Sequence, residues 1–430
     1  MIPPIVPALS MPMFAVTLCL LLVAPLALAG VALINTGLGR SRSAAQSLLG
    51  SLMIVAVTAI VFAVVGAAFT GVAGALGHSF DISGKPFDWL GSGRLLLGGL
   101  DSAGPEAQLT LLFEFLAVAL CALIPWGSGA DRFRLLAGCA AAAVLAAIVF
   151  PLAAHWIWGG GWLAQLGLNF SLGQGSLDGG GAAAVHVLGG LGALAVIWIA
   201  GPRKGKFPKE GFATALPGHH AVFVLFGCLL ALVGCLAWNV AGAVLWLHAA
   251  PAALVVTAVN TLLAASAAVV ATFAVTRIRF GKPDASLCAN GWLTGLVASS
   301  ACAGLITPFD ALLVGAIAGV ATPLLVELLE LALSIDDPSG AISVHAAGGI
   351  WGLLAVGLFG REPGQFIAQL VGISALVGLL LPLVYLLFWL LNRALPFRVE
   401  TDGERIGMDL HELGGGAYPE FVIHRDESYR

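Results

Sequence analysis

The sequence predicts an all-α polytopic membrane protein. Of its 430 residues, 59% are hydrophobic and only 10% are charged, whereas soluble domains carry about 25% charged residues. Apolar runs of about 20 residues recur along the whole chain, and each is long enough to cross a bilayer as a helix. Because the runs are continuously apolar rather than alternating, they favour helices over the strands of a closed barrel. The 56 glycines suit helices that pack closely in a membrane.

We predict eleven membrane-spanning helices. They cover residues 12–35, 46–75, 108–127, 136–155, 181–201, 219–238, 248–275, 286–304, 309–333, 342–360 and 365–392. An odd number places the two termini on opposite sides. Loops on one side carry thirteen Lys and Arg residues, and those on the other carry three, Lys85, Arg94 and Arg361. Since basic loops stay in the cytoplasm, we expect the N-terminus outside and the C-terminus inside.

The chain divides into a long apolar part and a short polar one. Residues 1–396 are expected to form a transmembrane transporter domain, and residues 397–430 a cytoplasmic tail. The first span is not expected to be a cleaved signal peptide, because no positively charged region precedes it. The tail is too short for a catalytic domain, and it could dock on the cytoplasmic face or bind a regulator.

Two spans begin with the same pattern. Asp178 precedes His186 by eight residues, as Asp337 precedes His345, and glycine-rich apolar sequence follows each histidine. In the predicted topology the two spans run in opposite directions, which indicates an inverted repeat of about 12–201 and 219–360 with one extra span. Such repeats place the substrate path at their interface. Eight helical residues rise about 12 Å, so both histidines would lie near mid-membrane.

The matched histidines are the strongest functional candidates, because an ionisable residue inside a span is costly. Either one alone could be a structural residue bonded to a backbone carbonyl. As a pair, they could pass a hydrogen-bonding solute through a narrow pore or relay a proton. A metal site is disfavoured, since no carboxylate accompanies them and the seven Cys lack metal-binding spacing. We predict neither a metal nor a cofactor.

Other polar residues have structural and functional interpretations. Asp178 and Asp337 are expected to cap helices, and Asp178 could also raise the local cation concentration. Asp336 is expected to act as a cap or to remain solvated. Glu114 is the only carboxylate well inside the span 108–127. It could reach the outer surface, pair with another chain or line the entry.

Tryptophans and further histidines gather near span ends. Trp156, Trp158 and Trp162 could form an interfacial belt or a cation-binding vestibule, because Trp is the best cation–π partner. Four histidines are expected at the membrane interface: His155, His219, His220 and His248. The sequence has no phosphate loop and no GxSxG elbow, so we expect a protein that is not an enzyme. The net charge of −4 gives no indication of a nucleic-acid partner.

Five segments together resemble motifs of the ammonium transporter family (Amt/methylammonium permease/Rh). They are Asp178-(x)7-His186, Asp336-Asp337-Pro338-(x)6-His345, Trp158-Gly-Gly-Gly-Trp-Leu, Gly281-Lys-Pro with Asn290-Gly-Trp-Leu-Thr-Gly-Leu-Val, and Gly407-Met-Asp-Leu-His-Glu-Leu-Gly-(x)2-Ala-Tyr418. The resemblance runs in order from about residue 12 to 420. It implies a homotrimer in a bacterial inner membrane, with one pore in each subunit and a PII-type regulator at the tail. It also implies ammonium capture at Trp158, supported by Asp178, and a pore lined by His186 and His345.

The outer site departs from the family pattern. The two phenylalanines of the usual gate correspond to Ala117, with Phe113 nearby, and to Trp238. Gly242 stands where many members have an ammonium-binding serine, and Glu114 where a neutral polar residue is common. The resemblance therefore implies a divergent member with an altered outer gate. Its ammonium-binding positions would be Trp158, Asp178, Trp238, Gly242 and Glu114, and its gate positions Trp238, Ala117 and Phe113.

Three functions follow from these observations. The first is transport of ammonium or ammonia past the paired histidines. The second is an ammonium sensor with little flux. The third is a channel for another small solute, such as carbon dioxide or methylamine, which the altered gate would suit.

Overall fold

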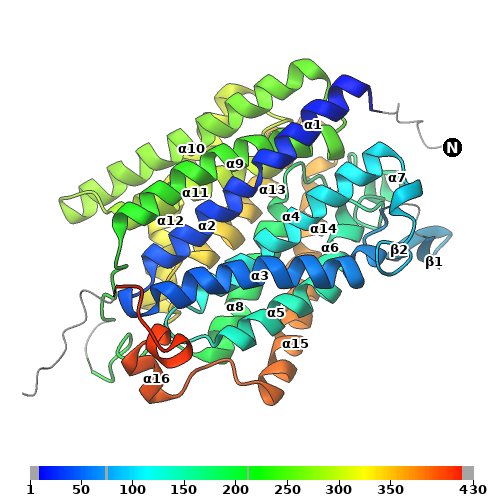
Figure 1. Cartoon of the computed structure of the whole chain (residues 1–430). Coiled ribbons are helices and arrows are strands. Elements are labelled where there is room, and N and C mark those ends of the chain that lie inside the picture. Colours follow the sequence, from blue (N-terminus) through cyan, green and yellow to red (C-terminus); the bar gives the residue numbers. More distant parts are fainter. Residues whose placement is uncertain (1–8, 73–75, 211–212, 419–430) are drawn as a thin grey trace, which may run out of the picture.

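The computed structural model describes residues 9–72, 76–210 and 213–418, which form a bundle of long helices with one small β-hairpin (Figure 1). The α-helices are α1 (Met11–Val23), α2 (Pro25–Leu38), α3 (Ala44–Val64), α4 (Pro105–Ser128), α5 (Leu135–Val144), α6 (Phe150–Ile157), α7 (Leu166–Phe170), α8 (Leu188–Ala200), α9 (Ala221–Trp246), α10 (Pro251–Phe280), α11 (Ala285–Cys302), α12 (Pro308–Glu327), α13 (Gly348–Phe359), α14 (Gln365–Ala375), α15 (Leu381–Ala394) and α16 (Thr401–Ile406). The strands are β1 (Leu76–Ile82) and β2 (Lys85–Ser92).

Short turns of 3₁₀ or π helix join or extend these helices. They are η1 (Ser41–Ser43), η2 (Gly66–Phe69), η3 (Leu100–Ser102), η4 (Leu145–Val149), η5 (Ala182–Val187), η6 (Leu328–Ala332), η7 (Ile342–Ala347), η8 (Leu376–Leu380) and η9 (Asp409–Leu413). With these turns included, ten helical segments of the described chain are long and apolar enough to cross a membrane.

The ten segments coincide with ten of the predicted spans. The remaining predicted span, 286–304, is α11, which is helical but carries Asn290, Thr294 and Ser299 and is not among the ten. The count of eleven therefore stays a prediction. The span predicted at 219–238 is too short, because α9 continues to Trp246. Its last two turns contain Asn239 and several small residues, which lowered the local apolar signal.

The start and packing of the helices follow from their sequences. Three helices, α4, α10 and α12, begin with proline after an extended residue, where its missing N–H loses no hydrogen bond. Helices α10 and α12 pack backbone to backbone. A Cβ at Gly315 or Gly319 would lie 2.1 Å from the carbonyl oxygen of Ala264 or Ala268. This contact of small residues four apart is typical of membrane helices.

The prediction of an all-α fold is wrong in the segment before α4. There β1 and β2 form an antiparallel hairpin, whose tip places Ser83 and Gly84 at φ of 55° and 76°, as two-residue hairpin turns require. Asp81 Oδ1 accepts a hydrogen bond of 2.8 Å from Gly84 N. The predicted span 46–75 also runs too far, since α3 ends at Val64 and η2 follows. Apolar sequence continues beyond that end, so hydropathy alone does not mark it.

The hairpin and α16 lie at opposite ends of the helix bundle (Figure 1). At the α16 end, the described part of the tail packs against the first turns of α3 and α5 through Asp409 and Glu412. Of the two possibilities for the predicted tail, 397–430, the described contacts agree with docking on the helix bundle, and binding of a regulator stays a prediction. Residues 419–430 of the predicted tail lie outside the described residues.

Candidate functional site

The two Asp-x7-His motifs have similar local structures. Asp178 Oδ1 accepts hydrogen bonds from Gly181 N and Ala182 N at 2.8 and 2.7 Å, and Oδ2 accepts from the next two backbone N–H groups. Asp337 accepts in the same way from Ala341 N at 2.9 Å and Ile342 N at 2.7 Å. Both carboxylates therefore cap the helical turns that carry the histidines, as the sequence predicts.

Each histidine lies in a π turn, η5 for His186 and η7 for His345. His186 N donates to the carbonyl of Gly181, five residues earlier, at 3.0 Å. Single π turns inside helices are rare and occur often at functional sites. The two imidazoles are each 5% exposed. Their rings are nearly parallel, at 18° and 5.1 Å between centroids, and the two Nδ1 atoms are 3.1 Å apart. The imidazoles therefore lie within hydrogen-bond distance of each other.

This contact fixes complementary roles for the two rings. A neutral imidazole has one N–H donor and one bare acceptor nitrogen. When one Nδ1 donates to the other, the donor ring keeps a bare Nε2 and the acceptor ring carries its proton on Nε2. The pair thus offers one acceptor and one donor to a solute. Exchange of these roles takes two proton transfers, one between the Nδ1 atoms and one between the Nε2 positions by way of the solute.

A cavity of about 350 Å³ lies on the hairpin side of the histidine motifs. Its lining includes Trp158, Trp246, Glu106, Thr110 and the segment at Asp178. Trp158 is stacked on Trp246 at 4.9 Å and 6°, and its Nε1 donates to the backbone carbonyl of Asp178 at 2.8 Å. Asp178 therefore positions Trp158 through its backbone while its carboxylate caps the helix.

Trp246 and Glu106 were not predicted as site residues. Trp246 lies in the part of α9 beyond the predicted span, and Glu106 lies at the start of α4, in a segment predicted as loop. Had the predicted helix from 221 been extended to 246, Trp246 would have lain two turns after Trp238 on the same face of the helix. That spacing is the signal that would have identified it.

An aromatic layer adjoins this cavity. Phe113 is fully buried, and its ring centroid lies 4.4 Å from Trp238, 5.5 Å from Trp158 and 5.7 Å from Trp246. Trp238 Nε1 donates to the carbonyl of Gly180 at 2.7 Å, which ties the layer to the motif of His186. The structure thus brings together two of the three predicted gate residues. The third, Ala117, is buried one helical turn further along α4.

Gly242 has no room for a side chain. A Cβ at this position would lie 2.0 Å from the carbonyl oxygen of Gly179 and 3.2 Å from Gly180 Cα. The backbone of the Asp178 segment therefore leaves no space for the serine that is common at this position in the family pattern.

Glu114 is fully buried within the described chain and does not reach the surface. Neither carboxylate oxygen has a hydrogen bond of good geometry to a described residue, although the Thr70 side chain lies beside it. His155 belongs to the same region and is 1% exposed. Its ring lies between Thr70 O, 3.3 Å from Nδ1, and Asp88 Oδ1, 3.2 Å from Nε2. Because Asp88 comes from the unpredicted hairpin, this burial was not predicted, and the membrane depth of His155 stays a prediction.

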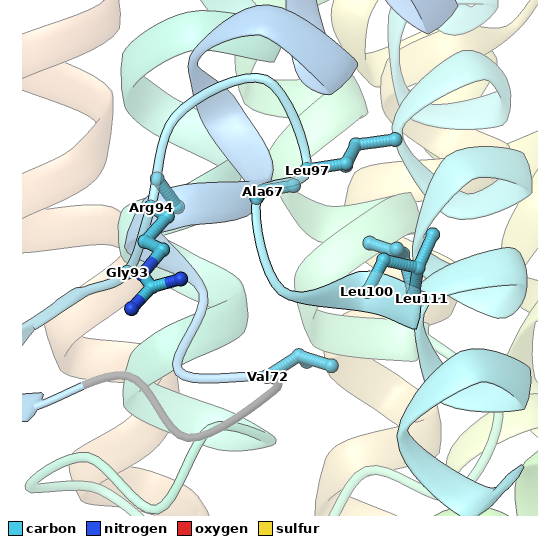
Figure 2. Close-up of a pocket in the computed structure, with 9 residues that line it drawn as sticks. Ala67, Val72, Gly93, Arg94, Leu97, Leu100 and Leu111 are labelled. Carbon is cyan, nitrogen blue, oxygen red and sulfur yellow. The ribbon is translucent and has the colours of Figure 1, made fainter. Parts of the chain in front are cut away.

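A second, much smaller cavity lies beside η2 and the start of α4 (Figure 2). Its volume is about 30 Å³, and Leu97, Leu100, Leu111 and Arg94 are among its lining residues. It has room for one or two water molecules. Neither histidine lines it.

Asp336 lies in a buried ion-pair network at the α16 end of the bundle. It is 1% exposed and pairs with Arg203 at 2.9 and 3.0 Å and with Arg132 at 3.8 Å. Arg203 also reaches Asp131 at 3.2 Å. Burial raises the pKa of Asp336, but the hydrogen bonds and charges of the two guanidinium groups outweigh it and hold that pKa below its ordinary value. The expectation that Asp336 is a cap or solvated is wrong, because its partners come from loops distant in sequence.

Within the described ranges, no group of three or more His, Cys, Asp or Glu side chains could hold a metal ion.

Comparison with known proteins assigns the chain to a family. Residues 14–418 match the Ammonium Transporter Family. The ammonium transporter Amt2 of Archaeoglobus fulgidus is 33% identical, with 93% of this chain and 86% of that protein covered. The Amt2 protein of Haloferax mediterranei is 29% identical, with 91% and 87% covered.

Solved structures agree with this assignment. A protein titled "Sensor Amt Protein" superposes with a TM-score of 0.84 at 25% identity, with 93% of this chain and 97% of that chain covered. Mep2 of Candida albicans shares the fold, with a TM-score of 0.77, 22% identity, and 95% and 90% covered. The relatives by sequence are named as transporters, and the described helices are those of a multi-pass membrane protein. The chain belongs to the ammonium transporter family, whose members are transporters rather than enzymes.

Proposed function

We propose that this protein moves ammonium or ammonia through a path in each subunit that is lined by His186 and His345. The observation that carries the proposal is the 3.1 Å contact between two buried imidazoles. Each follows a carboxylate-capped turn, so the backbone fixes where the rings lie. Buried ionisable side chains with this degree of positioning are typical of substrate or proton paths in membrane proteins.

Entry begins in the 350 Å³ cavity. Trp158 binds the ammonium ion by a cation–π contact, and Glu106 at the cavity wall raises the local cation concentration. Asp178 acts by holding Trp158 through its carbonyl. Phe113 and Trp238 form the gate that separates the cavity from the histidines, and Ala117 leaves space below them. Glu114 adds a buried carboxyl group next to Phe113 in sequence, while Gly242 leaves room for the backbone at 179 where a side chain would clash.

Passage beyond the gate requires loss of charge or of hydration. The side chains next to the histidines in sequence, Val185, Val187 and Val344, are apolar and buried, so a bare cation beside them would lose its solvation without compensation. Ammonium can release its proton to water in the cavity and continue as ammonia, whereas potassium cannot. A net current then requires that the proton cross as well, by relay through the histidine pair. The bare and protonated Nε2 atoms of the histidine pair then accept from and donate to the neutral solute.

The proposal includes a specific architecture. The chain would form eleven spans, as a five-plus-five inverted repeat with one extra helix, with the N-terminus outside and the C-terminus inside. Residues 1–396 would be the transporter domain and 397–430 the cytoplasmic tail, in a homotrimer of the bacterial inner membrane with a PII-type regulator at the tail. The paired capped π turns and the location of the hairpin and α16 at opposite ends of the bundle (Figure 1) support this architecture.

A sensor with little flux is the second candidate. Phe113 is packed among three tryptophans and leaves the gate closed in this conformation. The 25% identical neighbour is titled a sensor. A sensor would bind ammonium in the same cavity and transmit binding through the docked tail.

Ammonium-induced current in proteoliposomes tests the proposal. The wild type should give a saturable current, and His186→Ala should reduce it or change its ion selectivity. His78→Ala, on the exposed hairpin, is the matched control and should behave as wild type. If folded wild-type protein gives no current, ammonium binding measured by calorimetry decides between the candidates. Ammonia passage without charge is followed separately, by the internal pH of the proteoliposomes. Binding with neither current nor ammonia passage supports the sensor, and absence of binding, current and passage contradicts the two functions together.

A further inference from the structure

A basic hollow lies where the tail meets the membrane domain. Its volume is about 170 Å³, and it is lined by side chains from three separate segments. Those side chains are Arg40 and Arg42 from the turn before α3, Lys204 from the loop after α8, and Thr401, Glu404 and Arg405 from α16.

The single carboxylate in this lining is already occupied. Glu404 is 2% exposed. Its Oε1 accepts a hydrogen bond of 2.6 Å from the backbone N of Lys204, and its Oε2 pairs with Arg398 at 2.6 Å. Glu404 therefore closes one wall of the hollow without neutralising the cations that face it.

The four cations are weakly compensated. Arg40 approaches Asp131 only at 3.8 Å, and that carboxylate also serves Arg203. Arg405 approaches the exposed Asp402 at 3.8 Å. Among the described residues, no carboxylate lies within 4.0 Å of the charged groups of Arg42 or Lys204. Like charges gathered in a hollow repel one another unless an anion joins them.

We propose that this hollow binds a phosphate group. Arginine forks match phosphate oxygens with paired hydrogen bonds, and lysine adds a compact positive charge. The Thr401 hydroxyl supplies a further donor. Two sources carry the same group, free phosphate in the cytoplasm and the headgroup of an anionic phospholipid.

Binding there fastens the tail to the membrane domain. The hollow has Arg40 and Arg42 on one wall and Thr401 and Arg405 on the other, so one anion contacts both parts. The two parts are already in close contact next to it, since a Cβ at Gly407 would lie 2.6 Å from Arg42 Cβ. The bound phosphate thus sets how firmly the tail is docked, whatever solute the pore conducts.

The test uses full-length protein and two ligand probes. Inorganic phosphate binding is measured by calorimetry in a neutral detergent. Retention of phosphatidylglycerol, against phosphatidylcholine as reference, is counted by native mass spectrometry. The test variant is Arg42→Gln with Lys204→Gln. The control is Arg277→Gln with Lys282→Gln, which removes two exposed cations near the end of α10.

The double variant should bind the preferred probe roughly tenfold or more weakly, because it loses two charge-assisted contacts. The control should match wild type, and Arg42→Lys should retain part of the affinity. Added salt should weaken binding, since the groups are exposed. Phosphate binding in detergent identifies a free anion, and selective phosphatidylglycerol retention identifies a lipid headgroup. Equal binding by wild type and the double variant, or binding of neither probe by folded wild type, overturns the proposal.

Discussion

Trp158 has only one ring face available to a ligand. Trp246 covers the other face, and the indole N–H is fixed on Asp178 O. Trp158→Leu keeps an apolar side chain but removes the ring quadrupole, which is worth about 0.5–2 kcal/mol for a bound cation. The half-saturating ammonium concentration should therefore rise roughly 2- to 30-fold in current or binding measurements. Trp198→Leu is the matched control, because Trp198 is 51% exposed on the outer surface of α8. An unchanged half-saturation in Trp158→Leu would remove this residue from the capture site.

At Gly242, the neighbouring backbone leaves no space for the serine that many family members have at this position. Gly242→Ser places a side chain within 2.0 Å of Gly179 O, and overpacking of this kind costs about 1–3 kcal/mol. We expect a lower midpoint of thermal unfolding in detergent, and no gain in ammonium affinity. Gly378→Ser is the control, since a Cβ at Gly378 meets nothing within 4 Å. Tighter ammonium binding by a stable Gly242→Ser protein would show that the serine site exists after all.

At the scale of residues, prediction from sequence succeeded where spacing along one helix decides the geometry. The eight-residue interval places each histidine relative to its own cap, so the pair and its two caps were found. Spacing cannot reveal partners from distant segments. The prediction for Asp336 was therefore wrong, because Arg203 lies 133 residues away. The contact of His155 with Asp88 was not predicted, because Asp88 lies in the hairpin.

At the scale of elements, hydropathy located the helices better than their ends. Long apolar runs must be helical in lipid, which explains the agreement of ten segments. The run past Val64 stays apolar although α3 ends there, and α9 continues through polar Asn239. The hairpin escaped prediction because its seven- and eight-residue strands are short and lie in a loop rich in Gly and Asp.

The tail supplies caps that two helices lack in their own sequence. Neither Ser43 before α3 nor Arg134 before α5 caps its helix with a side chain. Asp409 instead accepts from Ala45 N and Gln46 N at 3.1 and 2.8 Å, and Glu412 accepts from Leu135 N at 3.0 Å. Carboxylates at helix N-termini are also favoured by the helix dipole. Docking of the tail is therefore coupled to the stability of the membrane domain.

Asp409→Ala combined with Glu412→Ala should loosen this docking. Each lost cap costs about 1 kcal/mol, which increases the fraction of molecules with an undocked tail. Trypsin should therefore cleave after the exposed Arg405 several times faster, in proportion to that fraction. The midpoint of thermal unfolding should also fall. Asp402→Ala, in the same tail but 79% exposed, should leave both readings unchanged. Equal cleavage rates in all three proteins would mean that these carboxylates do not hold the tail.

At the scale of the whole molecule, ion pairs connect segments that lie far apart along the chain. The network links the turn at 131–132, the loop at 203 and the segment that leads to His345. The neighbouring Arg398–Glu404 pair connects the tail to the same loop. The segment that leads to His345 is thus held by a buried ion-pair network, and this network lies next to the docked tail.

Asp336→Asn removes the central carboxylate of this ion-pair network. The change leaves Arg203 and Arg132 buried without their shared anion, and loss of one partner of a buried pair costs about 3–5 kcal/mol. The thermal midpoint in detergent should fall strongly, whereas Asp101→Asn at an exposed site should match wild type. Because the pKa of Asp336 is lowered in the folded protein, its stabilising contribution is complete above the unfolded value of about 3.9. That contribution is lost as the pH falls through the lower folded value. The difference between wild type and Asp336→Asn should therefore persist from about pH 7 to pH 5 and shrink below about pH 4. A difference that already disappears near neutral pH would show that Asp336 is not held ionised by the two arginines.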